Sequence, residues 1–297
     1  MEPNWEWYRA FLGVMQAGSL SAAARTLGLT QPTVGRHIDA LEAALGLKLF
    51  IRSHDGYTAS DAARHLLPYA EALAASAAAL ARVASSEGDG VRGTVRITAS
   101  DVVGVEVLPP ILARLREAHP ALTIELSLSD QLDNLLQREA DIAVRMVRPT
   151  QQAVVARRIG VVRVGLHAYA DYLARHGTPA TLAALDGHSL IGYDHDSEYL
   201  RRMRGQFPML DRERLALRVD SNLAQLAAIR AGYGIGFCQV GLAARAPMLT
   251  RLLAADVEIG LDTWIAMHED LRESPRCAVT FAALAEGMAA YIDASAP

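Results

Sequence analysis

The sequence predicts a multidomain α+β protein with a small helical head, one long helix, and a larger part built from two α/β lobes. Three observations support this fold class. Apolar residues recur at helical spacing in three short stretches within the first 46 residues, and an alanine-rich stretch with a regular apolar stripe covers residues 60–84. Beyond residue 92, strand-like apolar runs alternate with helical stretches, which is typical of a sheet with parallel strands.

Composition limits the class of protein. Of the 297 residues, 51% are hydrophobic and 21% are charged, and the mean hydropathy is +0.14. These values exclude a mainly disordered chain, and the length favours about two folded units. The formal net charge of −4 argues against a general polyanion binder, so a nucleic-acid site must rest on local geometry. The two cysteines, Cys238 and Cys277, are too few for a disulfide framework and fit a reducing cytoplasm.

Neither a membrane span nor a secretory signal is expected. The longest uncharged run, residues 10–24, has 15 residues, and a transmembrane helix needs roughly 18 or more. The amino terminus carries Glu2 and Glu6 where a signal peptide has a basic region. We therefore expect a soluble cytoplasmic protein with no membrane partner.

The head is expected to begin with three short helices. Residues 4–17 form the first helix. Ser19 or Ser21 can cap the second helix, and Thr30 can cap the third. Pro32 falls in the first turn of the third helix, where a missing amide hydrogen costs nothing. The apolar face of this third helix consists of Val34, Ile38, Leu41 and Leu45.

A β-ribbon and a long helix follow. The segment from Leu47 to Thr58 has a polar turn between short extended stretches, which favours a ribbon. From Ser60 to about Ala84, a heptad stripe is formed by Leu66, Ala70, Leu73, Ala77 and Leu80. We expect this stripe to pair with the same helix of a second subunit. The alternative is a helix that packs within its own chain. Residues 85–91, rich in Ser and Gly, are expected to form a hinge.

Residues 92–297 predict alternating strands and helices. In order they are TVRITAS, VLPPILARLREAHP, TIELSLS, LDNLLQREA, DIAVRM, SLIGYD, LALRVD, SNLAQLAAIRAG, YGIGFCQ, TWIAMH and a last helix from about Pro275 to Ile292. This pattern predicts a first lobe of about residues 92–162 plus 268–297 and a second lobe of about residues 163–267.

Ala24, Gly28 and Val34 have the residue types and the offsets, 4 and 6, that a helix-turn-helix needs. It requires a small residue where the helices cross, a glycine where the turn needs positive φ, and an aliphatic side chain that closes the joint. The exposed face of the third helix then presents Gln31, Thr33, Arg36 and His37. Glutamine can bond adenine, arginine can bond guanine or phosphate, and amides at a helix start can hold phosphate.

The charge of the head is balanced. Residues 1–60 contain five basic and five acidic side chains. Affinity for DNA would therefore depend on a few well-placed groups and on two or more domains that bind together.

The stretch SLSAAARTLGLTQPTVGRHIDALEAALGLKLFIR closely resembles the amino-terminal domain of the LysR-type transcriptional regulators. Later matches are GTVRITAS, ADIAVRM and VDSNLAQLAAIRAGYGIGF, so the resemblance covers the whole chain. It implies a winged helix-turn-helix domain over residues 1–60, a dimerising linker helix over 61–84, and an effector-binding domain over 92–297 that is similar to periplasmic binding proteins.

The resemblance also implies partners. These are double-stranded DNA, further copies of the same chain in a dimer or tetramer, and a small-molecule effector. The positions that would contact DNA are Ser21, Gln31, Pro32, Thr33, Arg36 and Arg52.

An effector site is expected between the lobes, where the carboxyl ends of strands meet. The residues at these ends are Ser100, Asp101, Ser129, Arg145, Ser221 and Asn222. Ser100 and Ser221 begin helices whose amides favour anions, and Arg145 adds a guanidinium suited to a carboxylate. This combination predicts a small organic acid or amino-acid-like effector. The alternative is that the serines only cap helices and that Arg145 makes a structural ion pair.

Two other classes of function are alternatives: an enzyme or a solute-binding protein that carries the helical head as an interaction module. The chain has no G-x-S-x-G, no P-loop, no dinucleotide-binding glycine pattern and no metal-ligand spacing. No catalytic residue, metal or cofactor is therefore expected. Four side chains that could suggest a metal lie near one strand end: His188, Asp194, His195 and Asp196. Because neither a helical HExxH nor a cysteine pair is present, a solvated loop is the favoured interpretation.

Overall fold

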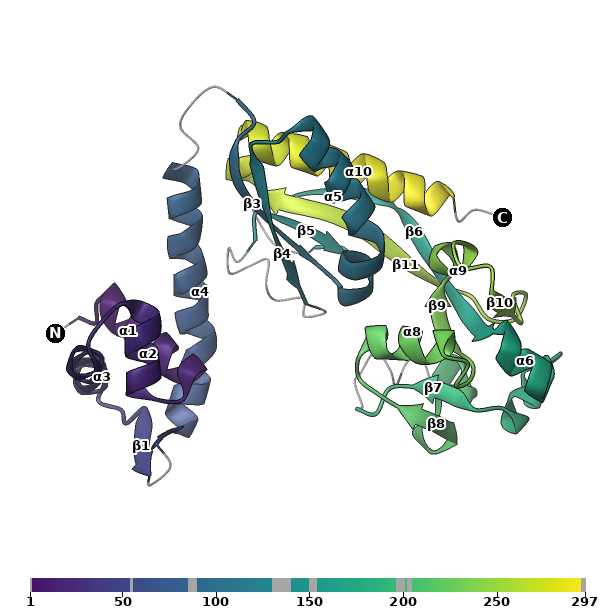
Figure 1. The fold of residues 1–297 in the computed structure, drawn as a ribbon, viewed down its shortest axis with the longest axis horizontal. Helices are drawn as coiled ribbons and strands as arrows, with labels where there is room; N and C mark the ends of the chain where they lie inside the picture. The colour runs from purple at the N-terminus through teal and green to yellow at the C-terminus, as the bar shows by residue number, and fades with distance from the viewer. Residues whose placement is uncertain are drawn as a thin grey trace. The chain divides into compact units, whose positions relative to one another are not determined.

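The computed structural model describes residues 2–53, 56–84, 90–129, 140–149, 154–195, 201 and 205–294, with backbone alone at 52–53, 56, 75, 79, 81–84 and 208. The helical head with its long helix is one compact unit, and the α/β part is a second (Figure 1). Most of the expected hinge and the helix expected at 132–140 lie outside the described residues.

The head consists of α1 (Trp5–Ala17), α2 (Leu20–Leu27), α3 (Gln31–Leu45), β1 (Phe50–Ser53) and β2 (Gly56–Ala59). Asn4, Ser19 and Thr30 each accept a hydrogen bond from an amide in the first turn of the helix that follows. Ser19, and not Ser21, therefore caps α2. Gly28 ends α2 with φ of 67°, which only glycine adopts without strain, and this allows the predicted tight turn into α3.

The long helix α4 (Asp61–Ala84) begins after Ser60, whose Oγ accepts a hydrogen bond from the amide of Ala63 at 3.1 Å. The first turns of α4 pack on α1 and on the core of the head. Ala70 is only 2% exposed within this single chain, and Leu66 packs against the same core. The expectation that Ala70 faces a partner helix is therefore wrong, because the head's own core covers it, whereas Leu66 is only half-buried and its contact with a partner helix stays a prediction.

A mixed sheet forms the centre of the α/β part. Its seven strands among the described residues follow the order β10-β6-β11-β5-β3-β4, and β9 also pairs with β6. The bounds are β3 (Gly93–Ala99), β4 (Leu122–Leu128), β5 (Ile142–Arg145), β6 (Val154–Tyr169), β9 (Gly236–Gln239), β10 (Leu249–Leu252) and β11 (Ile259–His268). β4 and β5 pair with β3 in parallel, whereas β6, β9, β10 and β11 make antiparallel pairs. The expectation of a parallel sheet is therefore correct for one end of this sheet only.

The long strand β6 was not expected from the sequence. Its first part pairs with β11 and its end pairs with β9 and β10, so one strand runs through both lobes. Periodicity misses it because Arg157, Arg158 and Arg163 interrupt its apolar residues.

Helices cover the sheet, and a smaller strand pair completes the second lobe. α5 (Leu108–Ala118) follows a π-helix over Val103–Val107 and lies beside α10 (Pro275–Asp293) against the sheet (Figure 1). The second lobe adds α6 (Ala170–His176), β7 (Leu190–Gly192), β8 (Leu215–Arg218), α8 (Asn222–Arg230) and α9 (Val240–Ala244), with β7 and β8 in parallel. In the described part of the chain, no helix has the length and apolar character to cross a membrane.

Candidate nucleic-acid interface and effector site

The start of α3 carries a compact set of polar groups. The hydroxyls of Thr30 and Thr33 are 2.8 Å apart, and Nη2 of Arg36 lies 3.4 Å from Oγ1 of Thr33. Gln31, Pro32 and Arg36 are exposed. The first-turn amides and the guanidinium therefore lie together at one helix end, which is an arrangement that can bind phosphate or base edges.

A hydrogen bond between exposed side chains joins α2 to α3. Oγ of Ser21 donates to Oε1 of Gln31 at 2.9 Å. Because its oxygen is engaged, the side chain of Gln31 has its Nε2 hydrogens left to donate. His37 is half-buried, and its Nδ1 has no hydrogen-bond partner among the described residues. The side chain of Arg52 lies outside the described residues.

Glu42 braces the end of α3 against the ribbon. Its side chain is buried, and Oε1 accepts hydrogen bonds from the amides of Leu49 at 2.8 Å and Phe50 at 3.2 Å. Nζ of Lys48 lies 2.5 Å from Oε2. Burial alone would raise the pKa of Glu42, but the hydrogen bonds from Lys48 and the two amides outweigh it and lower the pKa. The ribbon is thereby fixed to α3.

The outer face of α4 presents large apolar side chains to solvent. Tyr69 is 75% exposed, Leu73 is 42% exposed and Leu80 is 69% exposed. They are spaced by four and seven residues, so they lie near one another on one side of the helix. Ala77 is half-buried. The exposed stripe therefore consists of Tyr69, Leu73 and Leu80, and the inner stripe belongs to the head's own core.

Ser100 and Ser129 meet at one edge of the sheet in the first lobe. They directly follow β3 and β4, which pair in parallel up to Ala99 and Leu128. The amide of Ser129 donates to the carbonyl of Ala99 at 3.0 Å, and the carbonyl of Ser100 accepts from Gly104 at 2.8 Å. Asp101 begins the helical stretch that continues into the π-helix.

Arg145 does not form the exposed guanidinium expected at this edge. It is only 4% exposed, and its Nη2 donates to Oγ1 of Thr98 at 2.8 Å. β5 lies between β3 and β11, and Arg145 at its end pairs with Trp264 of β11. The exposed guanidinium that the sequence predicted is therefore absent at Arg145, and its contact with a ligand carboxylate stays a prediction.

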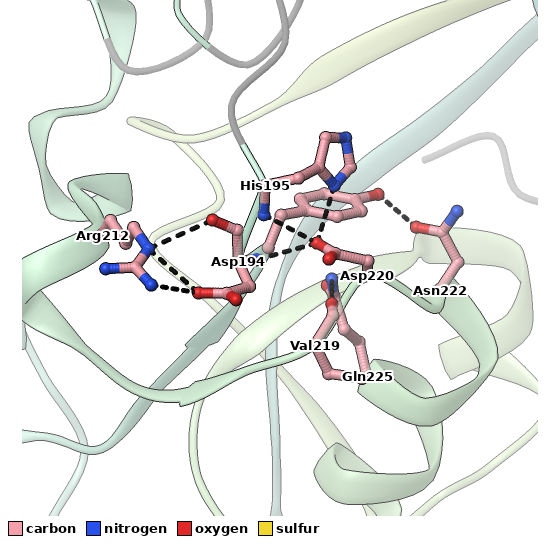
Figure 2. A network of polar contacts seen from close by, with 8 residues as sticks. Asp194, His195, Arg212, Val219, Asp220, Asn222 and Gln225 are labelled. Carbon is pink, nitrogen blue, oxygen red and sulfur yellow. Dashed lines mark hydrogen bonds and ion pairs between the residues drawn. The ribbon is translucent and has the colours of Figure 1, made fainter. Parts of the chain in front are cut away.

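The start of α8 carries the corresponding groups of the second lobe (Figure 2). Oγ of Ser221 accepts a hydrogen bond from the amide of Ala224 at 3.2 Å, which caps α8. The hydroxyl of Tyr193 donates to Oδ1 of Asn222. Nε2 of Gln225 donates to the carbonyl of Val219 at 2.9 Å. The loop after β7 is therefore bound directly to the first turn of α8.

Asp220 organises the loop beside this helix start. Its Oδ1 accepts hydrogen bonds from the amides of Asp194 and His195, both at 2.9 Å, and lies 2.7 Å from Nδ1 of His195 (Figure 2). These hydrogen bonds from His195 and Asp194 lower the pKa of Asp220. Arg212 forms an ion pair with Asp194 at 2.6 Å. Within the described residues, no group of three or more His, Cys, Asp or Glu side chains could hold a metal ion.

Two family models match the chain. The model described as "Bacterial regulatory helix-turn-helix protein, lysR family" matches residues 5–64. The model described as "LysR substrate binding domain" matches residues 88–289, which is more than half of the chain. The chain belongs to the LysR family.

Named relatives of this LysR-family chain are regulators. The HTH-type transcriptional regulator CrgA of Neisseria meningitidis serogroup C (strain 8013) is 27% identical over 193 residues, which cover 65% of this chain and 64% of that protein. The "Probable hydrogen peroxide-inducible genes activator" of Mycobacterium leprae (strain TN) is 35% identical over 158 residues, which cover 52% of this chain and 50% of that protein. The chain thus spans between half and two thirds of the length of these two relatives.

Solved structures share the fold. The crystal structure of CbnR, a LysR family transcriptional regulator, has a TM-score of 0.68 at 20% identity and covers 97% of this chain and 99% of that one. The structure of full-length CbnR complexed with target DNA has a TM-score of 0.66 at 20% identity. The match covers 96% of this chain and 99% of that one. The predicted fold class is thereby confirmed.

Sequence reasoning missed several residues that shape these LysR-type sites. Glu42 stands beside Leu41 on the apolar face of α3, and a charged residue on such a face is a signal that could have indicated its bracing role. The role of Asp220 carries no comparable signal, because its partners Asp194 and His195 lie 26 and 25 residues away along the chain.

Proposed function

We propose that the protein is a transcriptional regulator that binds double-stranded operator DNA through the exposed face of α3, as a homo-oligomer, and responds to a small organic anion bound at the strand ends of its α/β part. The observation that carries the proposal is the helix-turn-helix with Gln31, Thr33 and Arg36 at the exposed start of α3. The CbnR structure with its target DNA supports it by fold.

In this proposal α3 enters the major groove with its first turn. Arg36 contacts guanine or a phosphate, Gln31 contacts a base edge, and the first-turn amides hold a phosphate. Ser21 acts through Gln31, and Pro32 keeps the first turn in helical geometry. His37 and Arg52 are further DNA contacts in the proposal.

Oligomerisation would supply the affinity that one head lacks. The exposed stripe of Tyr69, Leu73 and Leu80 fits the same stripe of a second copy, and two linked heads then read two half-sites. This stripe accounts for pairing into a dimer. A tetramer would need further contacts between subunits outside the stripe. The protein would act in the bacterial cytoplasm, where operator DNA lies.

Binding to DNA is tested with the full-length protein, the duplex upstream of its own gene, and a scrambled duplex of equal length, at one physiological salt concentration. We expect the natural duplex to bind at least about a hundredfold more tightly, in line with specific sites in general. Arg36→Ala should remove this preference. Arg9→Ala removes one exposed arginine from α1 and serves as the matched control. If both variants behave alike, the proposed role of Arg36 is refuted.

The effector part of the proposal rests on the serines at the two helix starts. Ser221→Asp keeps an oxygen that can cap α8 but adds a negative charge, so it should abolish the response to an anionic effector. Ser221→Asn caps equally well without the charge and should keep the response. The test is to screen organic acids for an effect on DNA binding by both variants. If Ser221→Asp responds as fully as Ser221→Asn, an anion does not bind at this helix start.

A further inference from the structure

A groove of about 370 Å³ lies between parts of α5 and α10, and its lining includes none of Ser100, Ser129 and Ser221. Its walls are Pro110, Ile111 and Arg114 of α5, Ala290 and Tyr291 of α10, and Arg245, which follows α9. The groove lies within the α/β part, and both lobes contribute to it. It is therefore a candidate for a ligand that also contacts the junction of the lobes.

The shape of the groove follows from two small residues on α10. Gly287 lets the helices approach so closely that a Cβ at this position would lie 2.6 Å from Ile111. One turn further along, Ala290 again has little side chain, and it is exposed. The helices therefore touch at Gly287 and leave a space beside Ala290.

The floor of the groove is formed by Tyr291, which is held by a hydrogen bond and covered by a guanidinium. Tyr291 is 3% exposed, and its hydroxyl donates to Oε1 of Gln239 at 2.7 Å. The guanidinium of Arg245 lies 4.8 Å from the centre of the Tyr291 ring. This cation–π contact holds Arg245 in place over an apolar surface.

The two arginines of the groove, Arg114 and Arg245, form no ion pair among the described residues, although the charge of Arg245 helps to lower the pKa of Glu106. In the part of the chain that the structure describes, neither Arg114 nor Arg245 is within 4.0 Å of a carboxylate oxygen. The nearest acidic side chain in the hydrogen-bond network is Glu106, whose carbonyl lies 3.5 Å from Nη1 of Arg245. The carboxylate of Glu106 is already bound at both oxygens by Arg230. Two guanidiniums above apolar walls complement an anion with an apolar body.

We propose that this groove between α5 and α10 is a second binding site, separate from the strand ends, for a small organic monocarboxylate with an apolar body. The carboxylate binds Arg114 and Arg245, and the apolar body lies against Pro110, Ile111 and Ala290. Because Arg245 also contacts Glu106, which is paired with Arg230 of α8, the ligand acts at the junction of the two lobes.

The probe for this site is phenylacetate, titrated into the full-length protein by calorimetry, with phenylacetamide as the neutral isostere. We expect phenylacetate to bind saturably and phenylacetamide to bind at least about tenfold more weakly, because charge-assisted hydrogen bonds are lost. Arg114→Gln should lower the affinity for phenylacetate by about tenfold or more. Arg157→Gln removes an exposed arginine of β6 outside the groove and should leave the affinity within about twofold.

A second variant fills the space without changing charge. Ala290→Trp should block phenylacetate, whereas Ala282→Trp places the same side chain at an exposed position of α10 outside the groove and should not. Ser221→Asp separates this site from the proposed effector site, and it should leave phenylacetate binding unchanged. The proposal is overturned if phenylacetate does not bind the wild-type protein. It is also overturned if Ser221→Asp abolishes binding while Arg114→Gln and Ala290→Trp do not.

Discussion

Glu106 and Arg230 form a two-pronged ion pair, with nitrogen–oxygen distances of 2.6 and 2.8 Å, between positions 124 residues apart in the chain. Glu106 lies on the π-helix of the first lobe, and Arg230 is the last residue of α8 in the second lobe. The ion pair therefore links the two lobes directly, and a rearrangement of one lobe relative to the other would have to break it.

Removing this ion pair should lower the stability of the α/β part modestly. The hydrogen bonds from Arg230 lower the pKa of Glu106 below its ordinary 4.5. The stabilisation is therefore complete above pH 4.5 and disappears as pH falls through the lowered pKa. Both side chains are partly exposed, so we expect Glu106→Gln to cost only about 0.5–1 kcal/mol in urea unfolding at pH 7. Glu117→Gln on α5 is the exposed control. A double-mutant cycle with Arg230→Gln that shows no coupling would refute the pair's contribution.

Glu42 should contribute more to the free energy of unfolding than Glu106 does, because the side chain of Glu42 is buried. Glu42→Gln keeps an oxygen that can accept from the two backbone amides, but it removes the negative charge from these hydrogen bonds and turns an NH2 group toward Nζ of Lys48. We expect a loss of about 1–3 kcal/mol in the free energy of unfolding of the head. The pKa of Glu42 is lowered in the folded protein, so its contribution is full above 4.5 and is lost as pH falls below that value. Melting temperatures measured between about pH 3 and 7 should thus differ most at pH 7. The values for wild type and variant should converge in acid, where the carboxylate becomes protonated. Glu2→Gln is the exposed control.

Cys238 should be chemically inert in the native protein. Burial raises the pKa of its thiol to about 11, so the reactive thiolate is almost absent at neutral pH. Cys277 is also fully buried. Although the Mycobacterium leprae relative is named a peroxide-inducible activator, we expect hydrogen peroxide to leave the DNA affinity of this chain unchanged. Iodoacetamide should label neither cysteine until the chain is denatured, when both should react. A disulfide between the two cysteines after peroxide treatment would contradict this expectation.

The local parts of this fold could be predicted, whereas pairings between distant segments could not. Caps such as Thr30 and the glycine turn at Gly28 are encoded within a few residues, and both lie where the sequence places them. The pairings of β6 escape prediction because its partners β9, β10 and β11 are far along the chain. A period of three and four residues shows that α4 has an apolar stripe, but it does not say which neighbour covers Ala70.

The same limit applies to the candidate sites. Helix starts at Ser100 and Ser221 follow from strand ends that the sequence predicts. The burial of Arg145 depends on β3 and β11, which come from opposite ends of the α/β part of the chain. Its role could therefore not be judged from its position at the end of an apolar run.

The hydrogen bond from Ser21 to Gln31 should influence which base Gln31 reads. Because one lone pair of Oε1 is engaged, the Nε2 hydrogens of Gln31 are its freest groups, and they suit acceptors such as purine N7, guanine O6 or thymine O4. Ser21→Ala frees the whole oxygen to accept from the N6 amino group of adenine, so selection from a randomised operator should shift toward adenine at that position, by up to about 1–3 kcal/mol of discrimination. Thr26→Ala, on the same helix, removes a hydroxyl that donates to the backbone carbonyl of Ala22 and should leave the preference unchanged. Identical base preferences for wild type and Ser21→Ala would show that the bond has no part in recognition.

The exposed stripe on α4 should decide whether the protein is monomeric. Leu80 is 69% exposed in the single chain, and burying it against a second copy would contribute roughly 1.5–3 kcal/mol per side chain. Leu80→Glu places a charge in that contact, so the dimer dissociation constant should rise by well over about tenfold. Ala78→Glu introduces the same charge two residues away, on a different side of the helix, and should leave association intact. Sedimentation equilibrium at micromolar protein measures both variants. If Ala78→Glu dissociates the protein and Leu80→Glu does not, subunits associate through another face of α4.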